Sequence, residues 1–219
     1  MIDRDEIRLS RVHYPVTALG PGMRLGVWVQ GCTLGCRGCM SRDTWDINAG
    51  WSSSVADLIE HWRVASSRGA IGLTITGGEP SLQVEPLCAF IDAVRQHSHP
   101  TSEVDVLLFT GLEASEIDAT SARLIDRADA VILGRFVVTQ PTDLLWRGSA
   151  NQQLRLQTDL GRRRYTAYLS AESTAPEIQF AVDANRIWTI GVPRIGDLNA
   201  LERTLRAEGI EMGTVSWRP

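Results

Sequence analysis

GCTLGCRGCM, residues 31–40, contains three of the four cysteines in the chain. They follow the spacing C-x3-C-x2-C, at Cys32, Cys36 and Cys39, and glycines stand among them. Glycine lets a backbone fold closely around a compact body where larger side chains would clash. A disulfide framework would instead spread its cysteines in pairs along the chain, so this cluster indicates a metal centre in a reducing compartment.

The number of thiols separates the alternatives for this centre. A structural zinc site usually takes four protein ligands, and the fourth would have to be Cys88 or a histidine, neither of them at finger-like spacing. Cys88 falls in the middle of an expected helix, where a buried inert thiol is the simpler interpretation. A thioredoxin-type redox pair of Cys36 and Cys39 would leave Cys32 without a role. Three thiolates fit a cubane 4Fe–4S cluster with one open iron, and we favour this interpretation over zinc and redox roles.

The composition is that of a globular protein whose basic charge is carried entirely by arginine. The chain has 219 residues, 43% hydrophobic and 22% charged, which predicts one α/β domain or a core with a small appendage. The net charge is −4 and, apart from Arg162–Arg164, the basic residues are dispersed, so we expect no nucleic-acid partner. No apolar run is long enough for a membrane span and the N-terminus has no signal-peptide core, so we expect no membrane partner and a cytoplasmic location.

Strand-like and helix-like segments alternate through the first two-thirds of the chain. We expect strands at 24–31, 70–76, 103–111 and 128–134, separated by helices at 55–67, 83–97 and 113–126. Helical connections of this length favour right-handed crossovers and a parallel sheet, so the predicted fold class is α/β, a partial (βα) barrel. The cysteine loop then follows the first strand, at the rim where parallel barrels build their sites.

The regular alternation of strand-like and helix-like segments ends after residue 135. An irregular polar stretch is followed by segments that read as a β-hairpin and a helix, at 135–153, 177–192 and 197–208. We therefore divide the chain into residues 1–153, a core with an N-terminal segment, and residues 154–219, a small hairpin-and-helix extension packed on the core.

A second motif, GGEP at Gly77–Pro80, ends the second expected strand. A tight turn between a strand and a helix would by itself favour glycine and proline there. With C-x3-C-x2-C after the first strand, however, the chain resembles the radical S-adenosylmethionine superfamily. The resemblance implies that Cys32, Cys36 and Cys39 hold a 4Fe–4S cluster whose open iron is chelated by S-adenosylmethionine.

The resemblance also implies contacts to S-adenosylmethionine from two short runs of residues. These are Gly38, Cys39 and Met40 in the cysteine loop, and Gly77, Gly78, Glu79 and Pro80 in the turn. Glu79 or neighbouring backbone carbonyls would accept from the ammonium group of the methionine end, since a carboxylate facing a cation in a partly desolvated cleft is a favourable pairing.

Residues around both motifs narrow the resemblance to the activating-enzyme branch, in particular to the activase of anaerobic ribonucleotide reductase. The supporting stretches are VWVQGC (27–32), SRDTWD (41–46), FTG (109–111) and WRGSANQ (146–152). The similar region covers about residues 20–153, which is all of the expected core.

The resemblance implies an iron–sulfur oxidoreductase that reductively cleaves S-adenosylmethionine to a 5′-deoxyadenosyl radical for hydrogen abstraction. The implied partners are a glycyl radical enzyme, such as anaerobic ribonucleotide reductase, and an electron donor such as flavodoxin or ferredoxin. An alternative is a tailoring enzyme acting on a peptide, nucleoside or small metabolite, with the C-terminal extension as its recognition element. A third possibility, an iron–sulfur electron carrier or sensor, is disfavoured by GGEP. No general base is required, and we expect the four histidines to be surface or capping residues.

Overall fold

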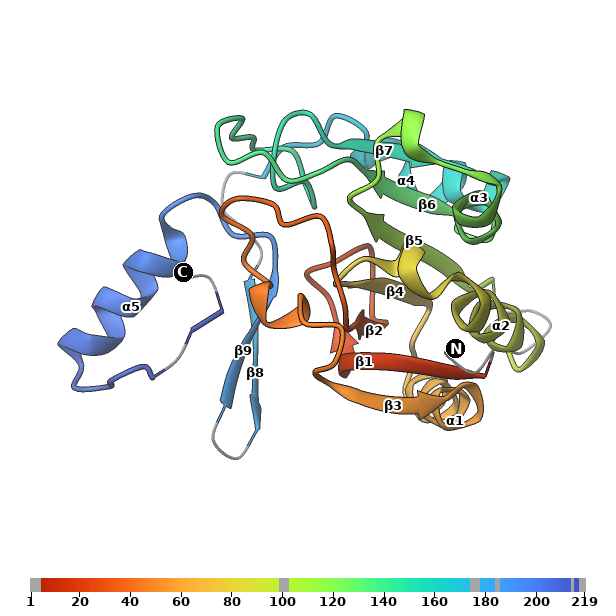
Figure 1. The fold of residues 1–219 in the computed structure, drawn as a ribbon, viewed down its shortest axis with the longest axis horizontal. Coiled ribbons are helices and arrows are strands. Elements are labelled where there is room, and N and C mark those ends of the chain that lie inside the picture. The colour runs from red at the N-terminus through yellow and green to blue at the C-terminus, as the bar shows by residue number, and fades with distance from the viewer. Residues whose placement is uncertain (1–4, 99–102, 174–177, 184–185, 214, 217–219) are drawn as a thin grey trace.

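A seven-stranded sheet forms the body of the protein in the computed structural model (Figure 1). The structure describes residues 5–98, 103–173, 178–183, 186–213 and 215–216. The strands of the sheet lie in the order β3-β1-β2-β4-β5-β6-β7, and β8 and β9 form a separate hairpin. The strands are β1 (Glu6–Val16), β2 (Arg24–Val29), β3 (Trp51–Ser54), β4 (Gly72–Gly77), β5 (Asp105–Thr110), β6 (Ala130–Leu133), β7 (Gln153–Leu156), β8 (Ile178–Asp183) and β9 (Arg186–Gly191). The α-helices are α1 (Val55–Ser67), α2 (Val84–Gln96), α3 (Ala119–Ile125), α4 (Asp159–Tyr165) and α5 (Asp197–Ala207).

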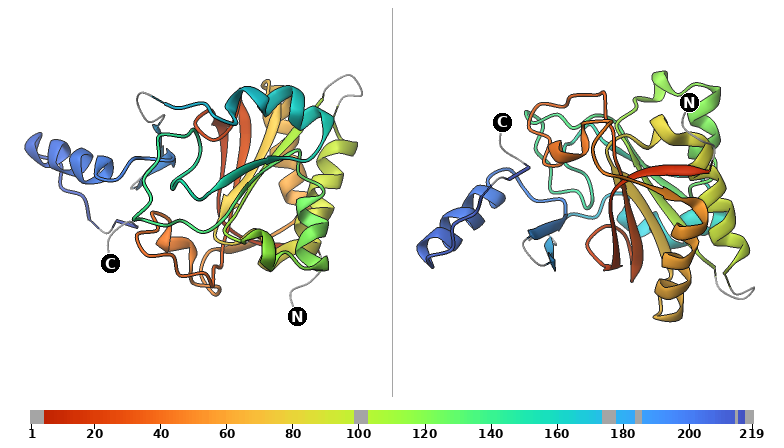
Figure 2. Two further views of the ribbon diagram at one scale, coloured as in Figure 1. Left: turned by 90° about the horizontal axis from the view of Figure 1, so that it is seen from above. Right: turned by 60° about the horizontal axis from the view of Figure 1, so that its bottom comes forward.

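Four neighbouring strands, β2, β4, β5 and β6, run parallel, as the alternation of strands and helices predicts. Antiparallel strands flank them, because β1 pairs with β2 on one side and β7 pairs with β6 on the other. The crossover helices α1, α2 and α3 cover one face of the sheet (Figures 1 and 2). The predicted fold class is confirmed as α/β, with a parallel-rich partial barrel followed by a hairpin and a helix. The carboxyl ends of all four parallel strands therefore meet at one edge of the sheet.

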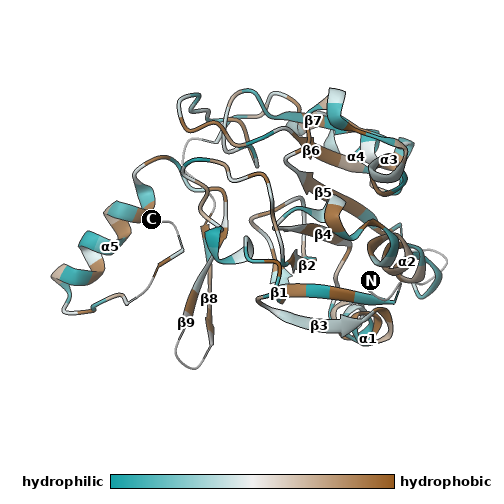
Figure 3. Ribbon diagram, in the orientation of Figure 1, coloured by the Kyte–Doolittle hydropathy of each residue, from teal (hydrophilic) through white to brown (hydrophobic). Residues whose placement is uncertain are grey.

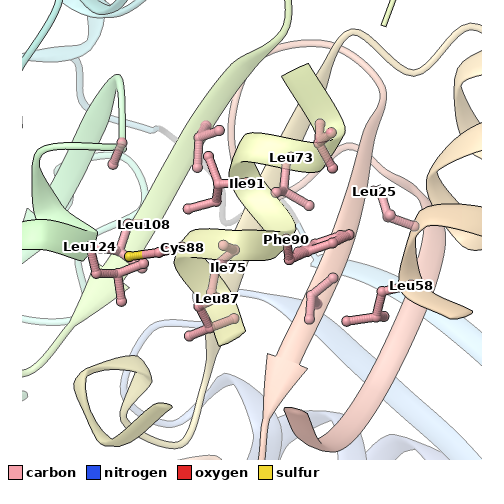
Figure 4. Packing of buried hydrophobic residues seen from close by; sticks show 14 of the residues in the cluster. Leu25, Leu58, Leu73, Ile75, Leu87, Cys88, Phe90, Ile91, Leu108 and Leu124 are labelled. Carbon is pink, nitrogen blue, oxygen red and sulfur yellow. The ribbon is translucent and has the colours of Figure 1, made fainter. Parts of the chain in front are cut away.

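The main hydrophobic core lies between the sheet and these helices (Figure 4). Leu73 and Ile75 of β4 belong to the same buried cluster as Leu87 and Phe90 of α2, and all four are fully buried. Burying a side chain of this size contributes roughly 1.5–3 kcal/mol. Cys88 is 3% exposed in the same cluster, as expected of an inert thiol. Figure 3 shows both hydrophobic and hydrophilic residues on α2, as expected of a helix with one face in a core.

The ends of two helices show how local signals fix them. Helix α1 has the predicted bounds, and the Ser54 hydroxyl before it accepts a hydrogen bond from the backbone N–H of Asp57 at 3.1 Å. Such a cap stabilises a helix by about 1 kcal/mol. The prediction that α3 starts at residue 113 is wrong, because Asp118 caps the helix by accepting from the N–H of Ser121 at 2.7 Å. A short 3-10 turn fills the interval before it.

A buried ion pair joins the amino ends of β2 and β5, away from the edge where the cysteine loop lies. The Arg24 Nη2 lies 2.8 Å from the Asp105 Oδ2, and both side chains are 0% exposed. Arg24 also donates to the Thr74 hydroxyl at 2.7 Å, while Tyr165 and Arg164 donate to Asp105. Burial alone would raise the pKa of Asp105, but the charge of Arg24 and these hydrogen bonds outweigh it and hold the pKa below its ordinary value. The pair therefore stabilises the fold only while Asp105 is ionised.

Several elements were not among those expected from the sequence. The N-terminal segment forms β1, which pairs with β2 and with β3. Strand β7 extends the sheet beyond β6 and crosses the expected division between residues 153 and 154, and α4 follows it. The basic cluster Arg162–Arg164 lies in the last turn of α4. The main sheet thus uses residues on both sides of the expected division.

The C-terminal hairpin packs on the body, while α5 projects from it (Figures 1 and 2). Ala181 of β8 and Ile190 of β9 are buried in a small cluster with Val16, Leu19 and Trp28. The Gln179 amide adds hydrogen bonds, since its Nε2 donates to the Pro15 carbonyl at 2.6 Å and its Oε1 accepts from the Thr17 N–H. None of the helices in the described ranges has the length and apolar content needed to cross a membrane.

Candidate functional site

A cavity of about 360 Å³ lies at the carboxyl ends of the parallel strands. Its size falls within the range usual for small-molecule and cofactor sites. The loops after β2, β4, β5 and β6 line it, and a fifth wall comes from the hairpin and the segment leading into α5. The cavity thus brings both sequence motifs together at the predicted rim of the partial barrel.

All three clustered cysteines line this cavity, and each is partly exposed. The loop is held by its own backbone, because the N–H of Cys39 donates to the carbonyl of Cys36 at 3.1 Å. The N–H of Ser41 donates to the Cys39 Sγ at 3.4 Å. Burial raises the pKa of the Cys32 and Cys36 thiols, and the charge of neighbouring cysteines raises it further. The three thiols therefore line one cavity from a single loop.

The three thiols of this loop are the candidate ligand set for an iron–sulfur cluster. Among the described residues, no three cysteine, histidine or carboxylate side chains are grouped so that they could hold one metal ion. A cubane cluster makes a different demand, because each thiolate binds a separate iron and three cysteines leave one iron open. Three thiols in one glycine-containing loop beside a cavity fit that demand.

The GGEP turn is hydrogen-bonded directly to the start of the cysteine loop. The N–H of Gly78 donates to the carbonyl of Val29, and the N–H of Glu79 donates to the carbonyl of Gly31, both at 2.8 Å. A Cβ on Gly78 would lie 2.2 Å from the Gly31 oxygen, so only glycine allows this approach. The two motifs therefore form one rigid junction at the cavity.

Glu79 is buried at 2% exposure, and its carboxylate accepts three hydrogen bonds from the chain itself. The donors are the Ser81 N–H at 2.9 Å, the Thr110 hydroxyl at 2.7 Å and the Gly111 N–H at 2.8 Å. The carboxylate thus ties the end of β4 to the end of β5. From the sequence, the family resemblance implied that Glu79 could accept from the ammonium group of S-adenosylmethionine. Nothing in the sequence indicated that its carboxylate joins the ends of β4 and β5.

The other residues that the sequence singled out lie as follows. Gly38, Met40, Gly77 and Gly78 line the cavity together with Glu79. Gly38 has a φ of +80°, a left-handed conformation that favours glycine. Pro80 is buried as the first residue of a 3-10 turn and is not among the residues that line the cavity.

The WRGSANQ stretch folds back on the end of β6. Gln152 is the centre of this fold, because its Oε1 accepts from the N–H of Gly148 at 2.7 Å and its Nε2 donates to the carbonyl of Gly134 at 2.9 Å. Trp146 lines the cavity as well, with a left-handed φ of 61° and 7% exposure. Arg147 points its guanidinium at the carbonyls of Tyr168 and Leu169, and burial lowers its pKa. The stretch thus builds one wall of the cavity.

Further lining residues were not predicted as site residues from the sequence. Trp28 and Phe109, from the VWVQGC and FTG stretches, supply aromatic surface, and the C-terminal extension supplies the last wall. The lining residues of that extension are Thr189, Gly191, Val192, Pro193, Arg194, Ile195, Gly196, Leu198 and Asn199. The extension also reaches the cysteine loop, where the Ser216 hydroxyl donates to the Met40 carbonyl at 2.7 Å. Only the fold could place residues so distant in sequence beside the cysteines.

Comparison with known proteins gives the family. Residues 18–155 match the model of a 4Fe-4S single cluster domain. An anaerobic ribonucleoside-triphosphate reductase-activating protein of Haemophilus influenzae is 31% identical over 150 residues, which cover 64% of this chain and 92% of the relative. The protein of the same name from Enterobacteria phage T4 is 32% identical over 148 residues, covering 64% of this chain and 88% of the relative. The solved structure of QueE from Escherichia coli matches with a TM-score of 0.41 at 15% identity, covering 94% of this chain and 92% of that one.

The matched residues include the three clustered cysteines and the GGEP turn, and both lie at the cavity. The chain therefore belongs to the 4Fe-4S single cluster domain family and is a radical S-adenosylmethionine enzyme with activating proteins among its relatives.

Proposed function

We propose that this protein activates a glycyl radical enzyme by removing the Cα hydrogen of a glycine. The observation that carries the proposal is the junction between its two motifs, in which the GGEP turn donates to the carbonyls of Val29 and Gly31 at the base of the cysteine loop. A cofactor that bridges both motifs would be held against a fixed surface, which is what positioning of a reactive group requires. The names of the relatives from Haemophilus influenzae and phage T4 support the same activity.

Cys32, Cys36 and Cys39 would hold the 4Fe–4S cluster, and the turn at Gly77 and Gly78 would face the methionine end of S-adenosylmethionine. When bound, this pair of cofactors supplies a 5′-deoxyadenosyl radical, formed with one electron from a donor such as flavodoxin or ferredoxin. Because the Glu79 carboxylate is already bonded three times within the chain, we assign it the positioning of the turn. The ammonium group of the cofactor would then donate hydrogen bonds to backbone carbonyls of the turn.

The remaining walls would shield the reactive centre from water. Trp28 and Trp146 are 5% and 7% exposed and line the cavity together with Phe109. A closed apolar surround prevents side reactions of a reactive intermediate and strengthens the electrostatic contacts inside. The chain itself thus contributes orientation and exclusion of water, while the cofactors contribute the chemistry.

A tailoring reaction on a peptide, nucleoside or small metabolite is the second candidate. It is favoured by one observation, the wall that residues 189–199 add to the cavity, because this wall lies outside the region that matches the family model. In a tailoring enzyme this wall would close over a small substrate in the cavity.

Isotope transfer separates the two functions. The anaerobic ribonucleoside-triphosphate reductase of Haemophilus influenzae, made with Cα-deuterated glycine, is mixed anaerobically with the reduced protein and S-adenosylmethionine. We expect a glycyl radical doublet by electron paramagnetic resonance and deuterium in 5′-deoxyadenosine, with neither signal from the Cys36→Ala variant. Cleavage of S-adenosylmethionine without a radical on the reductase would contradict activation and favour tailoring.

A further inference from the structure

The C-terminal hairpin has two faces with different surroundings. Strand pairing places Ala181 opposite Trp188 and Gln179 opposite Ile190. Side chains on this face pack on the body, since Ala181 and Ile190 are 8% and 2% exposed in a cluster with Trp28. The other face is free of that contact, because successive side chains of a strand point to opposite sides.

Three large apolar side chains remain exposed on the other face. Phe180 is 48% exposed, Val182 is 77% exposed and Ile187 is 51% exposed. Val182 and Ile187 are directly opposite each other in the register, and Phe180 is opposite Thr189. We call these three residues, Phe180, Val182 and Ile187, the hairpin strip. Contiguous apolar surface of this kind marks a site of interaction more often than a random surface.

The hairpin strip continues directly into the cavity. Ile187, Thr189 and Gly191 share one face of β9 because they alternate along it. Thr189 and Gly191 line the cavity that the cysteines also line. At about 3.3 Å per residue, the four residue steps from Gly191 to Ile187 span roughly 13 Å. An occupant that reaches from the cavity to the end of the strip must therefore be an elongated molecule.

We propose that the hairpin strip docks the polypeptide segment that carries the target glycine. Apolar side chains next to the glycine would cover Val182 and Ile187 while the glycine itself enters the cavity past Thr189. An extended segment of about four residues spans the distance from cavity to strip, whereas a single nucleoside or amino acid covers only the cavity end. The inference rests on the proposed activation of a protein substrate.

The sequence position of the strip supports a role in choosing the substrate. The family model ends at residue 155, and β8 and β9 lie beyond it. The strip is therefore an addition to the shared catalytic region, and it lies on the wall of the cavity that the family region does not build. Both strands of the hairpin pair only with each other within the described residues, and the three side chains of the strip are exposed.

The test compares a strip variant with a matched surface variant. Val182→Ser combined with Ile187→Ser removes the apolar surface, and Val64→Ser is the control, because Val64 is 50% exposed on α1. The measurements are cleavage of S-adenosylmethionine without partner, and the rate of glycyl radical formation against the concentration of the anaerobic ribonucleoside-triphosphate reductase from this protein's own organism. We expect unchanged cleavage of S-adenosylmethionine in all three proteins. In the strip variant alone, the KM for the reductase should rise about tenfold or more, because the variant lacks the aliphatic surface that binding would remove from water.

Three outcomes would overturn the inference. An unchanged KM in the strip variant refutes the docking surface while the activase function stands. A change from dimer to monomer in the strip variant, with an unchanged KM, assigns the strip to self-association instead. Cleavage by the parent protein with no radical on the reductase refutes the proposed function, and the docking role fails with it.

Discussion

Replacing Glu79 by glutamine tests whether this carboxylate organises the cavity. The side chain keeps its shape, but one carboxylate oxygen becomes an amide nitrogen that cannot accept a hydrogen bond. The remaining oxygen can keep the bonds to the Ser81 N–H and the Thr110 hydroxyl, because both donors already bond the same Glu79 oxygen in the parent protein. The Gly111 N–H, bonded at 2.8 Å to the other oxygen, then faces an NH2 group. One bond to a charged group is lost and a donor in a part-buried site is left unpaired.

The loss of one such bond costs about 1.5–3 kcal/mol. For a chain of this length, 1 kcal/mol shifts the unfolding midpoint by about 2–4 °C, so we expect Glu79→Gln to lower Tm by roughly 3–12 °C. Thermal unfolding of the anaerobically purified proteins by circular dichroism measures this. Thr110→Val should show a comparable loss, whereas Thr110→Ser keeps the hydroxyl and should melt near the parent. A Glu79→Gln protein that melts within about 1 °C of the parent would refute the positioning role.

Three further predictions follow from the same structure. Alanine at any of the three clustered cysteines should abolish the iron content measured after anaerobic purification. The Cys88→Ala variant should retain its iron, because Cys88 lies in the core. Iron retained in a variant of a clustered cysteine would contradict the ligand assignment. Arg24→Met should lower the free energy of unfolding in urea by about 3–5 kcal/mol, since it leaves Asp105 buried without its main partner. The folded pKa of Asp105 lies below its ordinary value. The stability that Asp105 contributes is therefore complete above the pH where an unfolded aspartate titrates, and it is lost as the pH falls through the folded pKa. The free energy of unfolding of the variant should consequently depend less on acid pH than that of the parent. Gly78→Ala should prevent stable cluster assembly, because its Cβ would lie 2.2 Å from the Gly31 oxygen, and a variant with full iron content and parental stability would show that the junction can relax.

Local signals account for what the sequence predicted well. The range of α1 follows from the Ser54 cap and the apolar spacing of Leu58, Ile59 and Trp62, all of them buried. The parallel order of the central strands follows from helical connections too long for hairpins. The cysteine loop and GGEP were recognisable because each is a short contiguous motif, and each falls at the carboxyl end of its strand.

Long-range pairing accounts for what the sequence left open. Strand β1 buries Ile7, Leu9 and Val16 among many polar residues, so its place beside β2 is decided by pairing and not by its own pattern. Two of the three hydrogen-bond partners of Glu79, Thr110 and Gly111, are 31 and 32 residues downstream, where β5 ends. The hairpin was predicted from its composition, but no local signal indicates that Thr189 lines the same cavity as the cysteines.

Formation of 5′-deoxyadenosine is the measurement that tests most directly whether this cavity holds a radical S-adenosylmethionine centre. The protein is reconstituted anaerobically with iron and sulfide, reduced with a strong reductant and incubated with S-adenosylmethionine, and the products are quantified by mass spectrometry. We predict equal amounts of methionine and 5′-deoxyadenosine from the parent and none from the Cys32→Ala, Cys36→Ala or Cys39→Ala variants. A parent protein that carries a complete, reduced 4Fe–4S cluster and forms no 5′-deoxyadenosine would contradict the proposed function at its base.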